Sequence, residues 1–184
     1  MFFIGVITNK NSENNIKNIM KDKLNESQII FLNENNLENF RNVKFDSIVI
    51  NNKIDDKYIL EKITKKSKYV LYNSDITDKN KMPNDCLNLI SYGFNSKANV
   101  TISSVEEDNY LLYIQSNING CNKKFGMQEI RFEKGKNNIN VYDGMITTII
   151  NLIYSKWKKW QNSVILKNIQ KNNFLCRQKK KNIV

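Results

Sequence analysis

Residues 2–7 read Phe2-Phe3-Ile4-Gly5-Val6-Ile7 and are apolar on both faces of an extended chain. Such a run is typical of a central parallel strand that helices cover on both sides. A polar turn, Thr8 to Glu13, comes next, and apolar residues then recur at helical spacing: Ile16, Ile19, Met20 and Leu24. We therefore expect a strand, a turn and a helix here, with Ser12 as the N-cap residue.

The same pattern of a strand followed by a helix continues to about residue 75. Further strands are predicted at residues 28–32, 46–50 and 69–72, and Asp55 is placed to cap a helix that carries Ile59, Leu60 and Ile63. Alternating strands and helices indicate an α/β fold, a mostly parallel twisted sheet flanked by helices. In such sheets ligands bind at the carboxyl ends of the strands.

After residue 87 the pattern changes to short strands separated by polar turns. These runs lie at residues 88–92, 100–105, 110–115 and 128–132, and Glu107-Asp108-Asn109 is the clearest hairpin turn. They predict an antiparallel β extension of the sheet.

Helical spacing from Val141 to about Gln170 predicts a C-terminal amphipathic helix, with one apolar stripe formed by Ile149, Ile153, Trp157, Trp160, Val164 and Ile169. We divide the chain into an α/β domain, residues 1–154, and a basic helical tail, residues 155–184, which we expect to be disordered toward its end.

The positive charge of the chain is concentrated in that tail. Of 184 residues, 29 are Lys or Arg and 18 are Asp or Glu, for a net charge of +11. Residues 151–184 hold eight lysines, one arginine and no acidic residue, so the rest of the chain is nearly neutral. Attraction to a polyanion is therefore expected from the tail. An AT-rich genome also enriches Asn, Lys and Ile, and this second explanation of the charge stays open.

Several classes of chemistry are excluded by composition. The chain has no histidine, and its three cysteines, Cys86, Cys121 and Cys176, form no close pair. Zinc-site spacings, a Ser-His-Asp triad and a Cys-His dyad are therefore ruled out, and we expect the cysteines to be buried or incidental. The longest apolar stretch, residues 145–154, is far shorter than the roughly 20 residues of a transmembrane helix. With no signal-peptide pattern at Met1, we expect a cytoplasmic location.

Five short segments of the chain are informative both by their motifs and by the order in which they occur. They are Phe3-Ile4-Gly5-Val6, residues 45–52 with Asp55-Asp56 after them, residues 69–75, residues 90–100 with their Tyr92-Gly93-Phe94, and residues 138–144. Together they resemble the central, nucleotide-binding domain of the Mur ligases and of the related folylpolyglutamate and cyanophycin synthetases. The most characteristic match is Tyr-Gly-Phe followed by a polar turn and Ala98-Asn99-Val100, and the resemblance covers residues 3–153.

This resemblance implies a P-loop-NTPase-like fold, ATP and Mg²⁺ as cofactors, an acid–amino-acid ligase activity and a place in cell-wall metabolism. The positions that match the family's nucleotide site are Asn9, Lys10, Ser12, Asn52, Asn73, Asp75 and Asn140. A second interpretation remains for several of them, because Asn73 and Asp75 also suit an ordinary polar turn. Asp55 and Asp56 suit magnesium ligands, whereas a helix cap needs only Asp55.

The departures from the family pattern change the expected function. A phosphate loop needs glycines that let backbone N–H groups turn toward the phosphates, and a lysine next to a Ser or Thr. Residues 8–13 contain no glycine, Lys10 and Ser12 are not adjacent, and Glu13 brings negative charge. The family's segment with its metal-binding Glu and His and its carbamylated lysine is much shortened, and its two outer domains have no counterpart.

We therefore expect a pseudoenzyme with a degenerate P-loop: no catalytic residues, no metal site, and ATP with Mg²⁺ only where the vestigial site still functions. The predicted role is a non-enzymatic binding or regulatory module. The alternative is an ATP-dependent amide ligase, or a nucleotide-binding subunit, that a partner chain completes.

Trp157-Lys158-Lys159-Trp160 combines aromatic and basic residues in the tail and is the candidate partner-binding segment. Its stripe is expected to pack on the domain's own sheet, to bind a protein partner or a second copy of the chain, or to lie on an anionic membrane. Nucleic acid binding through residues 177–181 is a further alternative. If the tail binds an anionic membrane or nucleic acid, the chain is a basic adaptor.

Overall fold

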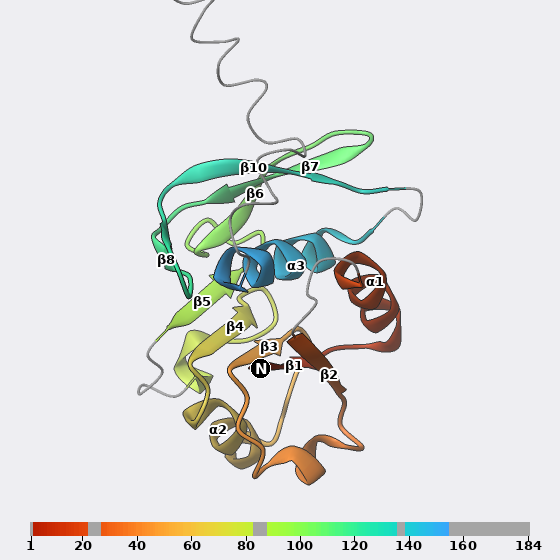
Figure 1. Cartoon of the computed structure of the whole chain (residues 1–184), viewed down its shortest axis with the longest axis vertical. Helices are drawn as coiled ribbons and strands as arrows, with labels where there is room; N and C mark the ends of the chain where they lie inside the picture. Colours follow the sequence, from red (N-terminus) through yellow and green to blue (C-terminus); the bar gives the residue numbers. More distant parts are fainter. Residues whose placement is uncertain (1, 22–26, 83–87, 136–138, 155–184) are drawn as a thin grey trace, which may run out of the picture.

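The computed structural model describes residues 2–21, 27–82, 88–135 and 139–154, and Figure 1 shows their arrangement. Most of the strands form one eight-stranded sheet in the order β10-β7-β6-β5-β4-β3-β1-β2. The strands of this sheet are β1 (Phe2–Ile7), β2 (Ser27–Leu32), β3 (Ser47–Ile50), β4 (Tyr69–Asn73), β5 (Leu89–Tyr92), β6 (Val100–Val105), β7 (Asn109–Ile114) and β10 (Gln128–Glu133). A short antiparallel hairpin, β8 (Ile118–Asn119) and β9 (Lys124–Phe125), forms a second sheet.

Neighbouring strands from β2 to β6 run parallel, whereas β6, β7 and β10 are antiparallel. The α/β fold with a mostly parallel sheet and an antiparallel extension is therefore confirmed. The antiparallel pairing begins later than predicted, at β7, because β5 pairs in parallel with β4 and β6 pairs in parallel with β5. The order 2-1-3-4-5 of the parallel strands is one of the common orders of doubly wound sheets.

The described helices cover the two faces of this sheet. They are α1 (Lys10–Met20), α2 (Lys57–Lys65) and α3 (Val141–Tyr154), with 3₁₀ turns η1 (Leu37–Phe40) and η2 (Lys79–Lys81). Side chains of a strand alternate between faces. In β1, Ile4 and Val6 pack in the core with α1 and α3, while Ile7 packs in the core with α2. Both faces of β1 are thus buried, as its sequence predicts.

Helix α3 is buried nearly all round. Residues 143–151 and Ile153 are buried, so the described part of the predicted amphipathic helix presents apolar residues to several neighbours at once. Figure 1 shows the antiparallel strands β6, β7 and β10 curling over α3, which lies between them and the parallel strands. The contact with β10 is close, because a Cβ on Gly144 would lie 3.0 Å from the ring of Phe132. The curled sheet encloses the helix.

Two predicted helix caps are wrong by a few residues. Asn9 and not Ser12 caps α1, and Ser12 is buried within the helix. Asp56 and not Asp55 caps α2, by accepting hydrogen bonds from the backbone N–H groups of Tyr58 and Ile59. Asp55 instead forms an exposed ion pair with Lys53. In each pair both side chains can cap a helix, and the residue at which the helix begins, Lys10 for α1 and Lys57 for α2, decides between them.

The β8–β9 hairpin has no counterpart among the predicted strands. Its turn holds Cys121, whose backbone N–H donates to the carbonyl of Ile153 near the end of α3. The Cys121 side chain is exposed, so of the two alternatives expected for the cysteines, buried or incidental, it is not buried; Cys86 and Cys176 lie outside the described residues. Within the described ranges, no helix has the length and apolar character needed to cross a membrane.

Candidate functional site

The carboxyl ends of the parallel strands bring polar side chains together. In a doubly wound sheet the ligand crevice lies where neighbouring connections leave in opposite directions, here between β1 and β3. The residues at the ends of β1, β3, β4 and β5 are Thr8, Asn51, Asn73 and Tyr92. Since these strands are adjacent in the sheet, the four side chains meet at one edge.

Asn51 is the centre of a hydrogen-bond network at this edge. Its amide nitrogen donates to the Thr8 hydroxyl at 3.2 Å. Its amide oxygen accepts from the amide of Asn73 at 3.2 Å and from the hydroxyl of Tyr92 at 3.1 Å. Tyr92 is fully buried and its hydroxyl also lies 3.2 Å from the carbonyl oxygen of Ile50. The network therefore uses the polar groups that a ligand at the switch point would otherwise meet.

Asp75 joins the end of β4 to the loop after β5. Its carboxylate accepts backbone hydrogen bonds from Phe94 at 2.7 Å and from Asn95 at 3.1 Å, and its own N–H donates to the side chain of Asn73. The hydroxyl of Tyr142, in the first turn of α3, donates to the same carboxylate at 3.0 Å. Asp75 thus links the Asn-x-Asp and Tyr-Gly-Phe segments, two of the motifs on which the family resemblance depends.

The surroundings of Tyr142 raise the pKa of its hydroxyl. Burial, and then the hydrogen bond and charge of Asp75, raise the pKa of Tyr142 to about 12. Its ring packs edge-on against Phe94, with centroids 5.5 Å apart. Phe94 itself is 52% exposed, so it leaves apolar surface open at this edge of the sheet.

The connection from β1 to α1 is only Thr8 and Asn9, because the strand ends at Ile7 and the helix begins at Lys10. The side chain of Asn9 accepts from the backbone N–H of Ser12 at 3.0 Å, which takes one of the N–H groups that an anion would use. The ammonium groups of Lys10 and Lys17 both bond to Glu13. The hydrogen bond from Lys17 is the largest cause of the lowered pKa of Glu13, so this carboxylate is held in its charged form.

The structure brings together some predicted site residues and separates others. Asn73 and Asp75 are hydrogen-bonded to each other, but Asn52 is exposed, and its side chain accepts from the N–H of the next residue, Lys53. Asn140 lies at the start of α3, where its side chain accepts from the N–H of Tyr142. Each of these side chains therefore has a structural role in a turn or a cap.

Three side chains near this edge have no counterpart among the predicted site residues: Tyr142, Asp143 and Asn15. Asp143 is completely buried in α3, and one of its carboxylate oxygens accepts from the amide of Asn15 in α1 at 2.9 Å. Its other oxygen has no hydrogen-bond partner among the described residues. The sequence did contain a signal for Asp143, because it is an acidic residue within an otherwise apolar helix and lies three positions after Asn140.

Across the described ranges, no group of three His, Cys, Asp or Glu side chains is placed to hold a metal ion. Asp55 and Asp56 diverge, one toward Lys53 and the other into the cap of α2, so they do not converge on a common point. The predicted partner-binding residues Trp157, Lys158, Lys159 and Trp160 lie outside the described residues, as does the rest of the basic tail.

Comparison with known proteins does not assign the chain to a family. No protein-family model matches the chain, and no curated protein matches it. The geometry of the site is therefore the basis for its interpretation.

Proposed function

We propose that this chain is a non-enzymatic binding or regulatory module, built on a degenerate Mur-type central domain of P-loop-NTPase-like origin. The proposal places it in the cytoplasm, in a process linked to the cell wall. The link to the Mur family rests on the order of the sequence motifs, since the strand order is shared by doubly wound folds of many functions.

One observation carries the non-enzymatic part of the proposal. The polar side chains at the carboxyl edge, centred on Asn51, bond to one another. A catalytic site instead keeps polar groups directed at the substrate, held so that they meet the charge that develops there. Filling this edge with internal hydrogen bonds favours a scaffold role for it.

The β1–α1 turn supports the same conclusion. A phosphate cradle is a glycine-rich loop several residues long, whereas this turn has two residues and ends in a side-chain cap. Glu13 lies in the first turn of α1, and it retains its charge beside two lysines. The negative charge opposes a triphosphate at this helix end.

A binding role suits the exposed side chains that remain at this edge. Phe94 is 52% exposed and Ile76, which follows Asp75, is 45% exposed. Apolar groups that a monomer leaves in water are frequent at interaction surfaces. The loop after β5 is held in place by Asp75, so this surface is organised in advance.

Calorimetry with ATP and Mg²⁺ tests the proposal on the full chain. We expect no binding in the micromolar range. Micromolar binding that Lys10→Ala abolishes and Lys17→Ala preserves would overturn it. Lys17 is the matched control, because both lysines contact Glu13 but only Lys10 lies at the helix start. A nucleotide-binding subunit that waits for a partner chain would retain ATP binding and would be identified by the same titration.

A further inference from the structure

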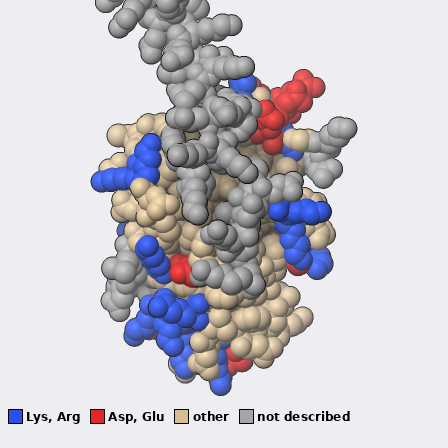
Figure 2. Space-filling model, viewed as in Figure 1, with Lys and Arg blue, Asp and Glu red and all other residues tan. Residues whose placement is uncertain are grey.

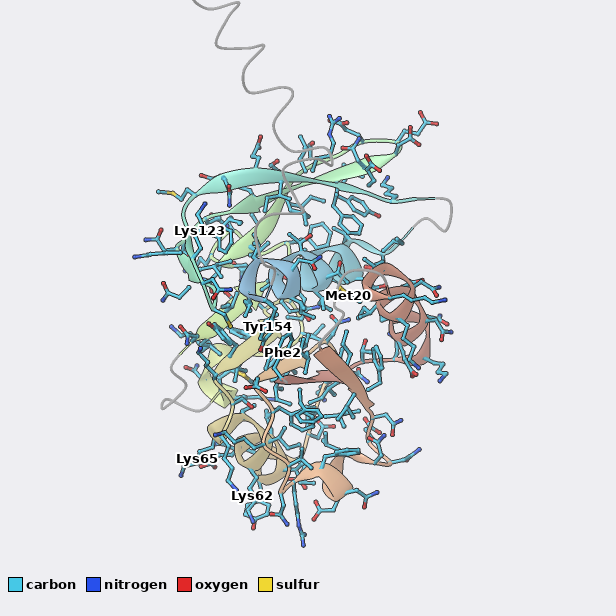
Figure 3. All side chains as sticks on the ribbon, in the orientation of Figure 1. Phe2, Met20, Lys62, Lys65, Lys123 and Tyr154 are labelled. Atoms are coloured by element: carbon cyan, nitrogen blue, oxygen red, sulfur yellow. The ribbon has the colours of Figure 1, made fainter. Side chains whose placement is uncertain are left out.

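A pocket of about 300 Å³ lies beside α2 and the segment that comes after η1. Its lining includes Arg41, Lys62, Lys65 and Lys66, with Glu61 and Tyr58. Figure 3 labels Lys62 and Lys65 on α2, and Figure 2 shows basic side chains gathered over the same part of the surface. The pocket shares no residue with the Asn51 network, so a ligand bound in it is independent of the proposed function.

The helical period of α2 places the pocket residues on one side. Tyr58, Lys62 and Lys65 follow the spacing i, i+4, i+7, so they form one stripe. Leu60 and Ile63 are buried on the opposite side, in the core beneath the sheet. The residues of the outward stripe are exposed, whereas Leu60 and Ile63 pack the helix onto the domain.

Positive charge in this pocket is only partly compensated, because its lining has four basic residues and one acidic residue, Glu61. Arg41 pairs with Glu38, and the ammonium of Lys62 lies 4.4 Å from the centre of the Tyr58 ring. Neither Lys65 nor Lys66 has a carboxylate partner among the described residues. The carbonyl groups at the C-terminal end of α2 attract cations, and this accounts for a lysine in its last turn. It does not account for Arg41, because that residue belongs to the segment after η1.

Tyr58 adds an aromatic surface to these cations. Its side chain is 61% exposed although the ring is large and apolar. Proteins that bind single-stranded nucleic acid combine a positively charged groove for the backbone with aromatic rings on which bases stack. A pocket of this volume is also in the range that accommodates a small organic group.

We propose that this pocket binds single-stranded nucleic acid. Arg41, Lys65 and Lys66 contact phosphates, and a base stacks on Tyr58. An anionic membrane fits less well, because the surface is concave and the apolar stripe of α2, which would have to enter the bilayer, is buried in the core. A duplex fits less well, because its bases are already stacked on one another.

The test measures binding of a fluorescein-labelled octa-uridylate to the full chain by anisotropy, over a range of salt concentrations. Every variant keeps residues 155–184, so the contribution of their basic residues is common to all. The charge-reversal variant is Lys65→Glu with Lys66→Glu. Its matched control is Lys97→Glu with Lys124→Glu, which changes the net charge equally at exposed sites elsewhere.

We expect the α2 pair to weaken binding about tenfold or more and to reduce the slope of log K against log salt by about 1.4, as loss of two phosphate contacts on a single strand requires. The control pair is expected to change affinity less than about threefold, because it lies away from the pocket. Tyr58→Ala is expected to weaken binding about fivefold or more with an unchanged salt slope, since stacking releases no counterions. Circular dichroism confirms that each variant is folded.

Equal effects of the two charge-reversal pairs would overturn the proposal, since binding would then follow net charge alone. It would also be overturned by loss of binding to phosphatidylserine vesicles in the α2 pair with octa-uridylate binding intact. Octa-uridylate binding that is absent from the unmodified chain at low salt, about 50 mM, would end it as well.

Discussion

The carboxylate of Asp75 lies directly against Gly93, so a Cβ on that glycine would come within 2.6 Å of Asp75 Oδ2. Gly93 also has φ of +151°, a conformation that residues with a side chain rarely adopt. Two physical constraints therefore meet at one position: the backbone conformation of Gly93, and the steric contact with a carboxylate that the hydrogen bonds from Phe94 and Asn95 hold in place.

Gly93→Ala is expected to destabilise the domain by about 2–4 kcal/mol, because it combines backbone strain with a steric clash. Chemical denaturation measures the change. Gly126→Ala is the matched control, since its nearest contact would be at 3.6 Å and its φ is not positive. In an Asp75→Ala background the clash disappears, so the effect of Gly93→Ala should fall by about 1 kcal/mol or more. Additive effects in this double-mutant cycle would show that contact with Asp75 is unimportant.

Asn51→Ala is expected to lower the free energy of unfolding by about 2–3 kcal/mol. It removes the acceptor of the buried Asn73 amide and the donor to the buried Thr8 hydroxyl, which leaves these two polar groups without that partner. The Tyr92 hydroxyl loses one of its two acceptors and keeps the carbonyl of Ile50. Asn52→Ala, at the neighbouring exposed position, should change stability by less than about 0.5 kcal/mol. Thermal and denaturant unfolding of both variants decides the point, and equal effects would contradict a network centred on Asn51.

Asn9→Ala is expected to cost about 1 kcal/mol through loss of the cap on α1. Asn11→Ala, at an exposed position in the first turn, is the control and should be nearly neutral. Asn9→Ser should recover most of the loss, because a serine hydroxyl also accepts from the helix N–H groups. An unchanged midpoint of urea unfolding in Asn9→Ala would show that the cap contributes nothing.

Tyr142 predicts a pH dependence at alkaline pH. Its pKa is raised to about 12, first by burial and then by Asp75, so the folded state favours the protonated phenol. This contribution to stability is fully present below pH of about 10, the ordinary pKa of tyrosine, and is lost as the pH rises through about 12.

Phenolate absorbance measures this titration, and the difference between the unmodified chain and Tyr142→Phe assigns it to Tyr142. Asp75→Asn removes the charge but keeps an acceptor, so it should move the pKa of Tyr142 toward its ordinary value of about 10, while burial keeps it above that value. A Tyr142 that titrates at the ordinary tyrosine pKa in the unmodified chain would contradict the contact with Asp75.

Local pattern predicted the elements of this fold well. The run Phe2-Phe3-Ile4-Gly5-Val6-Ile7 became β1 with both faces buried, and residues 100–105 became β6. The periodic apolar residues Ile16 and Met20 lie in the core, as expected for one stripe of a helix. Periodicity is set by the geometry of each element, so it can be read without knowledge of the partners.

The candidate site was only partly predictable. The motifs that contain Asn73, Asp75 and Tyr92-Gly93-Phe94 lie together at the carboxyl edge of the sheet, as expected, because strand ends can be read from the pattern. Their roles could not be read in the same way, since an exposed polar residue after a strand suits a ligand site and a turn equally well. The basic pocket could not be predicted from the sequence, because Arg41 and Lys65 are far apart in the chain and line the same pocket only after folding.

The sequence by itself determined the α/β character, the buried first strand and the places where helices and strands occur, because these depend on spacing along one segment. Only the tertiary structure decided that β5 pairs in parallel, that the antiparallel strands enclose α3, and that Asp75 rests on Gly93. Strand pairing and side-chain contacts join residues distant in the chain, and many arrangements satisfy the same local pattern. The free energy of packing them together selects one.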